Sequence, residues 1–199
     1  MKRAVTLRVT NSSAMHKVLL IVTCLLFVAK ETEHIPVCCI PTRRMFTYSM
    51  KQFVDTSERL WTVKTTKPGN ISCQYDQRRL ISDNFIIYNT TFFHGRQRYS
   101  IRLRGDFDPR EPKRMLVSTL DMVPFSVETL LYQAHNYSCG VVKMEILTGD
   151  RVTQYDLRVK NSSIGFRLHS RCNRQFRRAA GHGRYIYSSE CQRLIKLQK

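Results

Sequence analysis

The sequence predicts an all-β protein, an eight-stranded antiparallel barrel with one C-terminal α-helix packed outside it. About eight short runs rich in β-branched and aromatic residues follow one another at fairly even spacing, with turn residues between them. One amphipathic run at helical spacing comes after the last of them. The chain has 199 residues, which is enough for one domain with a sizeable core.

The N-terminal part is expected to be a secretion signal. The apolar run 18–29 follows Lys17 and ends on a small residue, which fits the h-region of a signal peptide and is too short for a membrane span. A buried core helix is the alternative interpretation. We therefore predict a secreted, extracellular protein with three parts: an upstream extension and signal peptide at 1–29 (its start being Met1 or Met15), an irregular lead-in at 30–50, and the barrel with its helix at 51–199.

Turn residues and period-two alternation define the strands. The clearest alternation lies in 98–104, where Tyr99 and Ile101 share one face and arginines occupy the other. Ser170 is a plausible N-cap and Gly181 a plausible stop for the helix, and a helical turn is expected at 53–59. The predicted strands are 61–65, 71–76, 85–93, 98–104, 115–122, 127–134, 138–147 and 152–160.

The inward faces of these strands supply the candidate lining of a ligand cavity, because an eight-stranded barrel is just wide enough to hold one small molecule. Ordinary core packing is the alternative for each position. Four glycosylation sequons begin at Asn70, Asn89, Asn136 and Asn161. If Asn89 carries a glycan, period-two geometry turns its neighbours inward. The inward set is Ile86, Tyr88, Phe92, Tyr99, Ile101, Val142 and Met144.

The charge is strongly basic, with 33 Lys and Arg against 15 Asp and Glu. Such a field attracts anions, although a soluble basic surface is the simpler explanation. Catalysis is not expected, because no nucleophile, phosphate-loop or metal-ligand motif organises the polar residues. No cofactor and no metal are expected, nor is a nucleic-acid partner. After signal removal six cysteines remain, and their pairing cannot be chosen from spacing alone.

The order of elements after Trp61 resembles the tick salivary lipocalins, the histamine-binding protein family. The matching residues are Ile71-Ser-Cys73, Cys139-Gly-Val141, Tyr155-Asp-Leu-Arg158, Cys172 and Tyr187-Ser-Ser-Glu-Cys191. The resemblance covers most of the chain between Trp61 and Cys191 and implies a lipocalin barrel. It also implies the disulfides Cys73–Cys191 and Cys139–Cys172, whereas Cys38 and Cys39 have no counterpart.

In the histamine-binding members an Asp follows the cysteine that corresponds to Cys139, and this Asp contacts the amine together with a Glu and a Trp of the next strand. This chain has Gly140, Asp156 and Arg158 at those positions. If Arg158 points inward it favours an acidic lipid, unless Asp156 neutralises it in an internal ion pair. Alternation instead places Asp156 and Arg158 in solvent, because Tyr155 and Leu157 belong to the apolar face. The resemblance favours the inward orientation.

Two functions follow from the resemblance. The first is sequestration of a small host mediator, either a biogenic amine such as histamine or serotonin or an acidic lipid such as a leukotriene, to suppress host defence. The second is a non-enzymatic inhibitor that binds a host protein of complement, clotting or platelets. The ligand-binding residues expected for the first are Tyr88, Phe92, Tyr99, Ile101, Val142, Asp156 and Arg158.

Overall fold

The computed structural model describes residues 47–149, 151–164 and 170–197. The expected signal peptide, most of the lead-in and Cys38 and Cys39 lie outside the described residues. The elements are α2 (Met50–Val54), β1 (Leu60–Thr65), β2 (Ile71–Ile81), β3 (Phe85–His94), β4 (Gln97–Phe107), β5 (Arg114–Thr119), β6 (Pro124–Gln133), β7 (Cys139–Ile146), β8 (Thr153–Lys160), a 3-10 turn (Asn161–Ser163), α3 (Ser170–Ala180), β9 (Arg184–Tyr185) and α4 (Glu190–Leu197).

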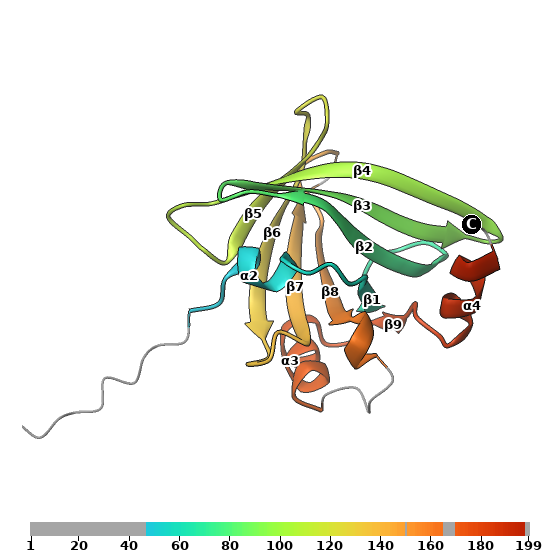
Figure 1. The fold of residues 1–199 in the computed structure, drawn as a ribbon. Coiled ribbons are helices and arrows are strands. Elements are labelled where there is room, and N and C mark those ends of the chain that lie inside the picture. The colour runs from blue at the N-terminus through green and yellow to red at the C-terminus, as the bar shows by residue number, and fades with distance from the viewer. Residues whose placement is uncertain (1–46, 150, 165–169, 198–199) are drawn as a thin grey trace, which may run out of the picture. The chain divides into compact units, whose positions relative to one another are not determined.

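The eight long strands form a closed antiparallel barrel, as the sequence predicts (Figure 1). From β2 to β7, each strand pairs with the next one along the chain. Strand β1 completes the barrel, because it pairs with β8 along most of its length and with β2 at Leu60 and Trp61. The helix α3 lies outside the barrel and contacts β6, β7 and β8.

The seam between β1 and β2 is completed by the C-terminal segment. Strand β9 pairs with Lys64 and Thr65 of β1. The next residue, Ile186, donates its N–H to the carbonyl of Val63 at 3.0 Å and accepts the N–H of Cys73 at 2.6 Å. The C-terminal segment therefore lies between the two strands where they separate. A strand of two residues is too short to be predicted from alternation.

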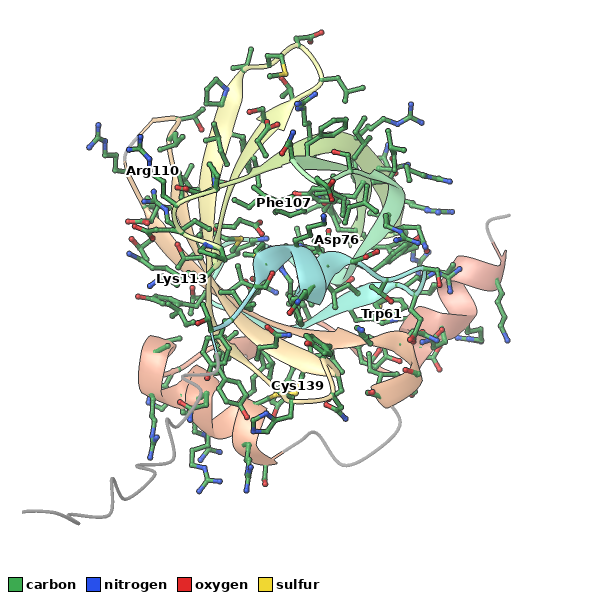
Figure 2. All side chains as sticks on the ribbon, turned by 60° about the vertical axis from the view of Figure 1, so that its left-hand side comes forward. Trp61, Asp76, Phe107, Arg110, Lys113 and Cys139 are labelled. Atoms are coloured by element: carbon green, nitrogen blue, oxygen red, sulfur yellow. A yellow bond between two sulfur atoms is a disulfide. The ribbon has the colours of Figure 1, made fainter. Side chains whose placement is uncertain are left out.

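Both predicted disulfides are present. Cys73 of β2 is bonded to Cys191 of α4, and Cys139 of β7 is bonded to Cys172 of α3. Figure 2 shows Cys139 on the side of the barrel that α3 covers. The first bond holds the segment that completes the seam, and the second holds α3 against the outer face of the sheet.

Apolar side chains are buried in two clusters on opposite faces of the barrel wall. The outer cluster lies between the sheet and the C-terminal helices and includes Trp61, Leu157 and Phe176. The inner cluster fills the end of the barrel beside α2 and includes Phe53 and Val142. The inner cluster closes that end of the barrel, and the cavity occupies the rest of the interior.

Two helices differ from the sequence prediction. The N-terminal helix begins at Met50 and not near Phe53, because the Ser49 hydroxyl accepts the N–H of Gln52 and caps it. A second C-terminal helix, α4, was not predicted. Gly181 ends α3 as expected, with φ of 67°. In the part of the chain that the structure describes, none of the helices is long and apolar enough to cross a membrane.

Candidate functional site

The barrel contains a cavity of about 470 Å³ that opens to solvent. Its wall is mostly apolar and aromatic, and a group of charged side chains lies at its inner end. A small number of polar groups in an apolar wall is the usual composition of a small-molecule site. The main apolar lining residues are Tyr88, Phe92, Ile101, Leu103, Phe125 and Met144.

Arg158 lies at the centre of the charged group. Its side chain is 3% exposed and donates two hydrogen bonds to Glu128, from Nη1 to Oε2 and from Nη2 to Oε1, both at 2.7 Å. The Nη2 atom also lies 3.5 Å from Asp156 Oδ2 and Nη1 lies 3.6 Å from Asp76 Oδ2. Two parallel hydrogen bonds between a guanidinium and a carboxylate form a strong, well-oriented ion pair. Arg158 is therefore already bound on its Glu128 side.

The remaining carboxylates have partners of their own. Asp156 accepts the hydroxyl of Thr65 at 2.6 Å and lies 3.2 Å from the ammonium of Lys67. Asp76 accepts the hydroxyl of Thr90 at 2.7 Å. Asp76 and Glu128 line the cavity, whereas Asp156 lies deeper in the wall with a fully buried side chain.

The group holds more acidic than basic side chains. Among the residues that the structure describes, Asp76, Glu128 and Asp156 face two cations, Arg158 and Lys67. A buried excess of negative charge is costly unless a further cation or proton is present. The inner end of the cavity therefore offers a place for one positively charged ligand group.

Burial raises the pKa of Asp76, which lines the cavity together with Glu128. Desolvation raises the pKa of Asp76 above its ordinary value, the nearby Arg158 lowers it, and the charge of Glu128 raises it again. The phenol of Tyr88 also has a pKa well above its usual range, chiefly through burial. For Arg158, burial lowers the pKa but the surrounding carboxylates outweigh it, so its pKa is raised and it stays charged. Asp76 is thus the carboxyl whose protonation a bound cation would change.

Close packing around Gly140 leaves no room for the Asp that the histamine-binding pattern carries at this position. A Cβ at this position would stand 2.7 Å from Cζ of Phe53 and 3.0 Å from Cδ1 of Leu130. Such an approach is not tolerated without movement. The place where the pattern carries an Asp is occupied here by an aromatic ring from α2.

The structure separates the seven predicted ligand residues into two groups. Tyr88, Phe92, Ile101 and Arg158 line the cavity. Tyr99 is not a lining residue; its ring stacks on that of Phe92, and the residue is 39% exposed. Val142 lies in the inner cluster below the cavity, and Asp156 is sealed behind Lys67 and Thr65. The role of all seven in ligand binding stays a prediction.

Asp156 and Arg158 point into the barrel, as the resemblance predicts and alternation does not. Their side chains are 0% and 3% exposed, yet Leu157 between them is also fully buried. The reason is that α3 covers the outer face of β8, so this strand has no solvent face. Arg158 does form the internal ion pair with Asp156, at 3.5 Å, but its shorter hydrogen bonds are to Glu128, which was not predicted.

Sequence analysis missed Asp76 and Glu128. The alternation of β6 places Glu128 on the same face as the buried Leu130, which was a usable signal. Asp76 had no such signal, because an irregularity between Ser72 and Tyr75 breaks the regular register of β2. Asp76 and Glu128 both lie on strands that are distant in sequence from Arg158, so their pairing with it could not be predicted from local pattern.

The predicted glycosylation sites occupy different surroundings. Asn70 and Asn136 are exposed, and Asn89 is half-buried and accepts a hydrogen bond from Arg102. Asn161 accepts the indole N–H of Trp61 at 2.9 Å and an amide N–H of Gln192 at 2.8 Å, so its side chain also joins β1 to the C-terminal segment. Attachment of glycans stays a prediction at each.

A closed eight-stranded antiparallel barrel with an internal cavity and a C-terminal helix outside it is the lipocalin fold. No protein-family model and no curated protein matches the sequence. Solved structures do: AM182, a protein in complex with serotonin, aligns with a TM-score of 0.52 and 20% identity over 68% of this chain and 85% of that one. Per a 4, a major allergen from cockroaches, aligns with a TM-score of 0.52 and 12% identity over 73% and 92%. These likenesses establish the fold.

Proposed function

We propose that this protein is a secreted lipocalin of the tick salivary type that sequesters a small cationic amine, such as histamine or serotonin, and so suppresses host defence. The observation that carries the proposal is the excess of carboxylates at the inner end of the cavity. Asp76 and Glu128 both face the space that a ligand would occupy. AM182, which has the same fold, is itself known in complex with serotonin.

The cavity suits an aromatic amine in shape as well as in charge. An ammonium group at the inner end would lie near Asp76, and the rest of the molecule would lie among Tyr88, Phe92 and Phe125. Aromatic side chains stabilise both flat rings and cations that approach their faces. A volume of about 470 Å³ has room for one such molecule.

An acidic lipid is less well supported. The sequence hypothesis assigned its carboxylate to Arg158, but both terminal nitrogens of that guanidinium already bind Glu128. A ligand carboxylate would have to displace Glu128 and would add a further negative charge to the group. We therefore propose an amine, and not an acidic lipid such as a leukotriene, as the ligand.

The direct test is calorimetric titration of the purified protein with serotonin, histamine and a leukotriene. We expect one amine molecule per protein and no measurable leukotriene binding. Asp76→Asn, which keeps the size of the side chain and can still accept from Thr90, should weaken amine binding by about tenfold or more, because a charged partner is lost. Asp106→Asn removes a carboxylate outside the cavity lining and should bind as the native protein does. Equal affinity in both variants, or tight leukotriene binding, would contradict the proposal.

Amine binding should weaken on acidification. The pKa of Asp76 is raised by burial, so its carboxyl gains a proton above the pH at which an exposed Asp would. An ammonium binds the ionised form, and affinity must therefore fall as the pH drops through that raised pKa. Serotonin is the suitable probe, because its amine stays charged throughout. Titrations from about pH 7 downward should show the decline in the native protein and a flat profile in Asp76→Asn; a flat native profile would exclude Asp76 as the titrating partner.

The alternative, an inhibitor that binds a host protein, is favoured by one surface feature. Leu120, Met122 and Val123, which do not line the cavity, are exposed on the connection between β5 and β6. An exposed apolar group of this kind is typical of a protein contact. Inhibition that persists with serotonin in the cavity would indicate this function.

A further inference from the structure

The helix α3 has two faces of very different character. Cys172 and Phe176 are buried against the barrel, and the disulfide to Cys139 holds the helix there. The outer face carries the exposed residues Arg171, Arg174, Arg177 and Arg178. The amphipathic pattern therefore accounts for the inner face, but it does not require the outer face to be so basic.

Within the described part of the chain, the arginines of the outer face have no acidic partner. The helix contains no Asp or Glu. Among the residues that the structure describes, the ion pairs involve other cations, such as Lys51, Arg78 and Arg104. Positions three and four apart on a helix are neighbours, so Arg174, Arg177 and Arg178 repel one another. Arg171 also lies in the first turn, where the helix dipole disfavours a cation.

This arrangement lowers helix stability, and the packing of Phe176 and the disulfide must offset that cost. Local conflicts that are retained in a stable fold are commonly found where the residues bind something. An anion held between the arginines would remove the repulsion. The surface also has a depression of about 400 Å³ at this point, lined by Ser170, Asn173, Arg174 and Arg177.

We propose that the outer face of α3 binds a linear sulfated polysaccharide. Its exposed surface offers charged and hydrogen-bonding groups but no aromatic or large apolar side chain, because the helix sequence is Ser-Arg-Cys-Asn-Arg-Gln-Phe-Arg-Arg-Ala-Ala and its Cys and Phe are buried. Single-stranded nucleic acid is bound through aromatic stacking, and a protein interface needs an apolar centre. A membrane surface would likewise require apolar side chains among the cations. A chain of sulfate groups needs only the arginines.

The site is independent of the amine cavity. Helix α3 contacts the outer faces of β6, β7 and β8, whereas the cavity lies inside the barrel. The protein would thus be retained on a sulfated matrix while its cavity stays accessible. Polysaccharide binding and amine binding can be measured separately, and either can fail without the other.

The test measures binding of the full protein to heparin at several salt concentrations. We expect affinity to fall steeply as salt rises, since the contacts are ionic. The variant Arg174→Gln/Arg177→Gln/Arg178→Gln should lose about tenfold or more in affinity at physiological salt. The matched control, Arg79→Gln/Arg96→Gln/Arg110→Gln, removes the same charge from exposed positions on other elements, including the β4–β5 loop that carries Arg110 (Figure 2). It should lose less than about threefold.

The outcomes distinguish a site from a general charge effect. Equal losses in the two triple variants would overturn the proposal, as would tighter binding of the native protein to double-stranded DNA of equal charge than to heparin. Thermal melting should show both variants folded, with the α3 variant at least as stable as native because repulsion is relieved. A clear destabilisation of the α3 variant alone would indicate that these arginines serve the fold instead.

Discussion

Arg158→Met is expected to destabilise the protein by about 3–5 kcal/mol, because it breaks a buried ion pair by removing one partner. Methionine fills a similar volume, so the loss is mainly electrostatic. Glu128 would lose both of its 2.7 Å hydrogen bonds, and Asp76 and Asp156 would lose a neighbouring cation. Lys67 would then be the single cation facing the three carboxyl groups within the described cluster. Urea denaturation at neutral pH gives the free energy of unfolding directly.

Arg104→Met is the matched control for this prediction. Arg104 also binds one carboxylate through two nitrogens, that of Asp106, but both side chains are partly exposed. Water replaces such an interaction, so the loss should be below about 1 kcal/mol. Similar losses in the two variants would mean that Arg158 contributes by packing alone. The double variant Arg158→Met/Glu128→Gln should recover part of the stability, since no unpaired charge then remains at residue 128.

The strands of the barrel could be predicted from the sequence because most of them follow simple physical rules. Alternation in β4 and turn residues between strands were sufficient for the number and order of strands. Alternation does not indicate the orientation of β8, because its outer face is covered and the strand has no polar side. Leu157 packs outside and Arg158 inside, and both are buried. Only the resemblance to a known family gave the right orientation there.

The candidate site was harder to predict than the fold because its charges come from strands distant in sequence. Arg158 was identified, but Glu128, its main partner, is 30 residues away on β6. The length of a strand and its hydrophobic pattern do not specify which charged groups meet inside a barrel. An inward acid opposite an inward arginine is fixed by the register between strands, and register depends on irregularities such as the one in β2.

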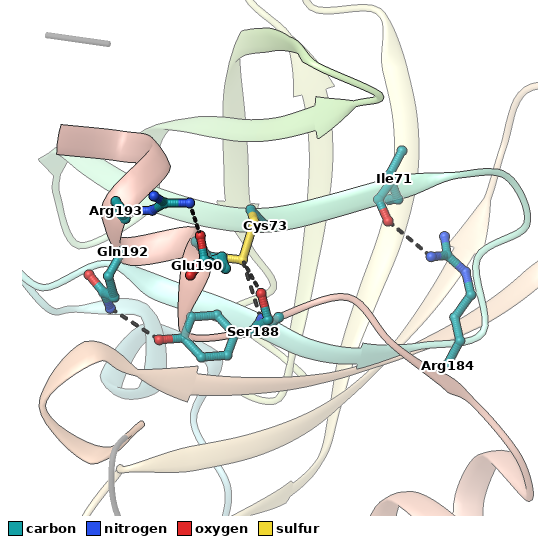
Figure 3. The surroundings of a disulfide bond; sticks show 9 residues. Ile71, Cys73, Arg184, Ser188, Glu190, Gln192 and Arg193 are labelled. Atoms are coloured by element: carbon teal, nitrogen blue, oxygen red, sulfur yellow. Dashed lines mark hydrogen bonds and ion pairs between the residues drawn. A yellow bond between two sulfur atoms is a disulfide. The ribbon is translucent and has the colours of Figure 1, made fainter. Parts of the chain in front are cut away.

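Loss of the Cys73–Cys191 disulfide should open the seam between β1 and β2. The bond ties α4 to β2, and the chain leading to α4 supplies the hydrogen bonds of Ile186 to Cys73 and Val63. Arg184 of the same segment donates to the carbonyl of Ile71, the first residue of β2 (Figure 3). In Cys73→Ala/Cys191→Ala these contacts depend on a two-residue strand alone. In this variant we expect the backbone N–H groups of residues 73 and 186 to exchange with deuterium much faster than in the native protein.

The loss of stability in that variant should also exceed the loss in Cys139→Ala/Cys172→Ala. The two bonds span 118 and 33 residues, so the first restricts the unfolded chain more. The chain-entropy model gives a difference of about 1 kcal/mol, on losses of roughly 2–5 kcal/mol each. The second variant should keep the seam protected from exchange, because its bond holds α3 and not β9. Unchanged exchange at the seam in the first variant would show that the backbone contacts of Ile186 are sufficient by themselves, and the barrel would then close without its covalent link to the C-terminal segment.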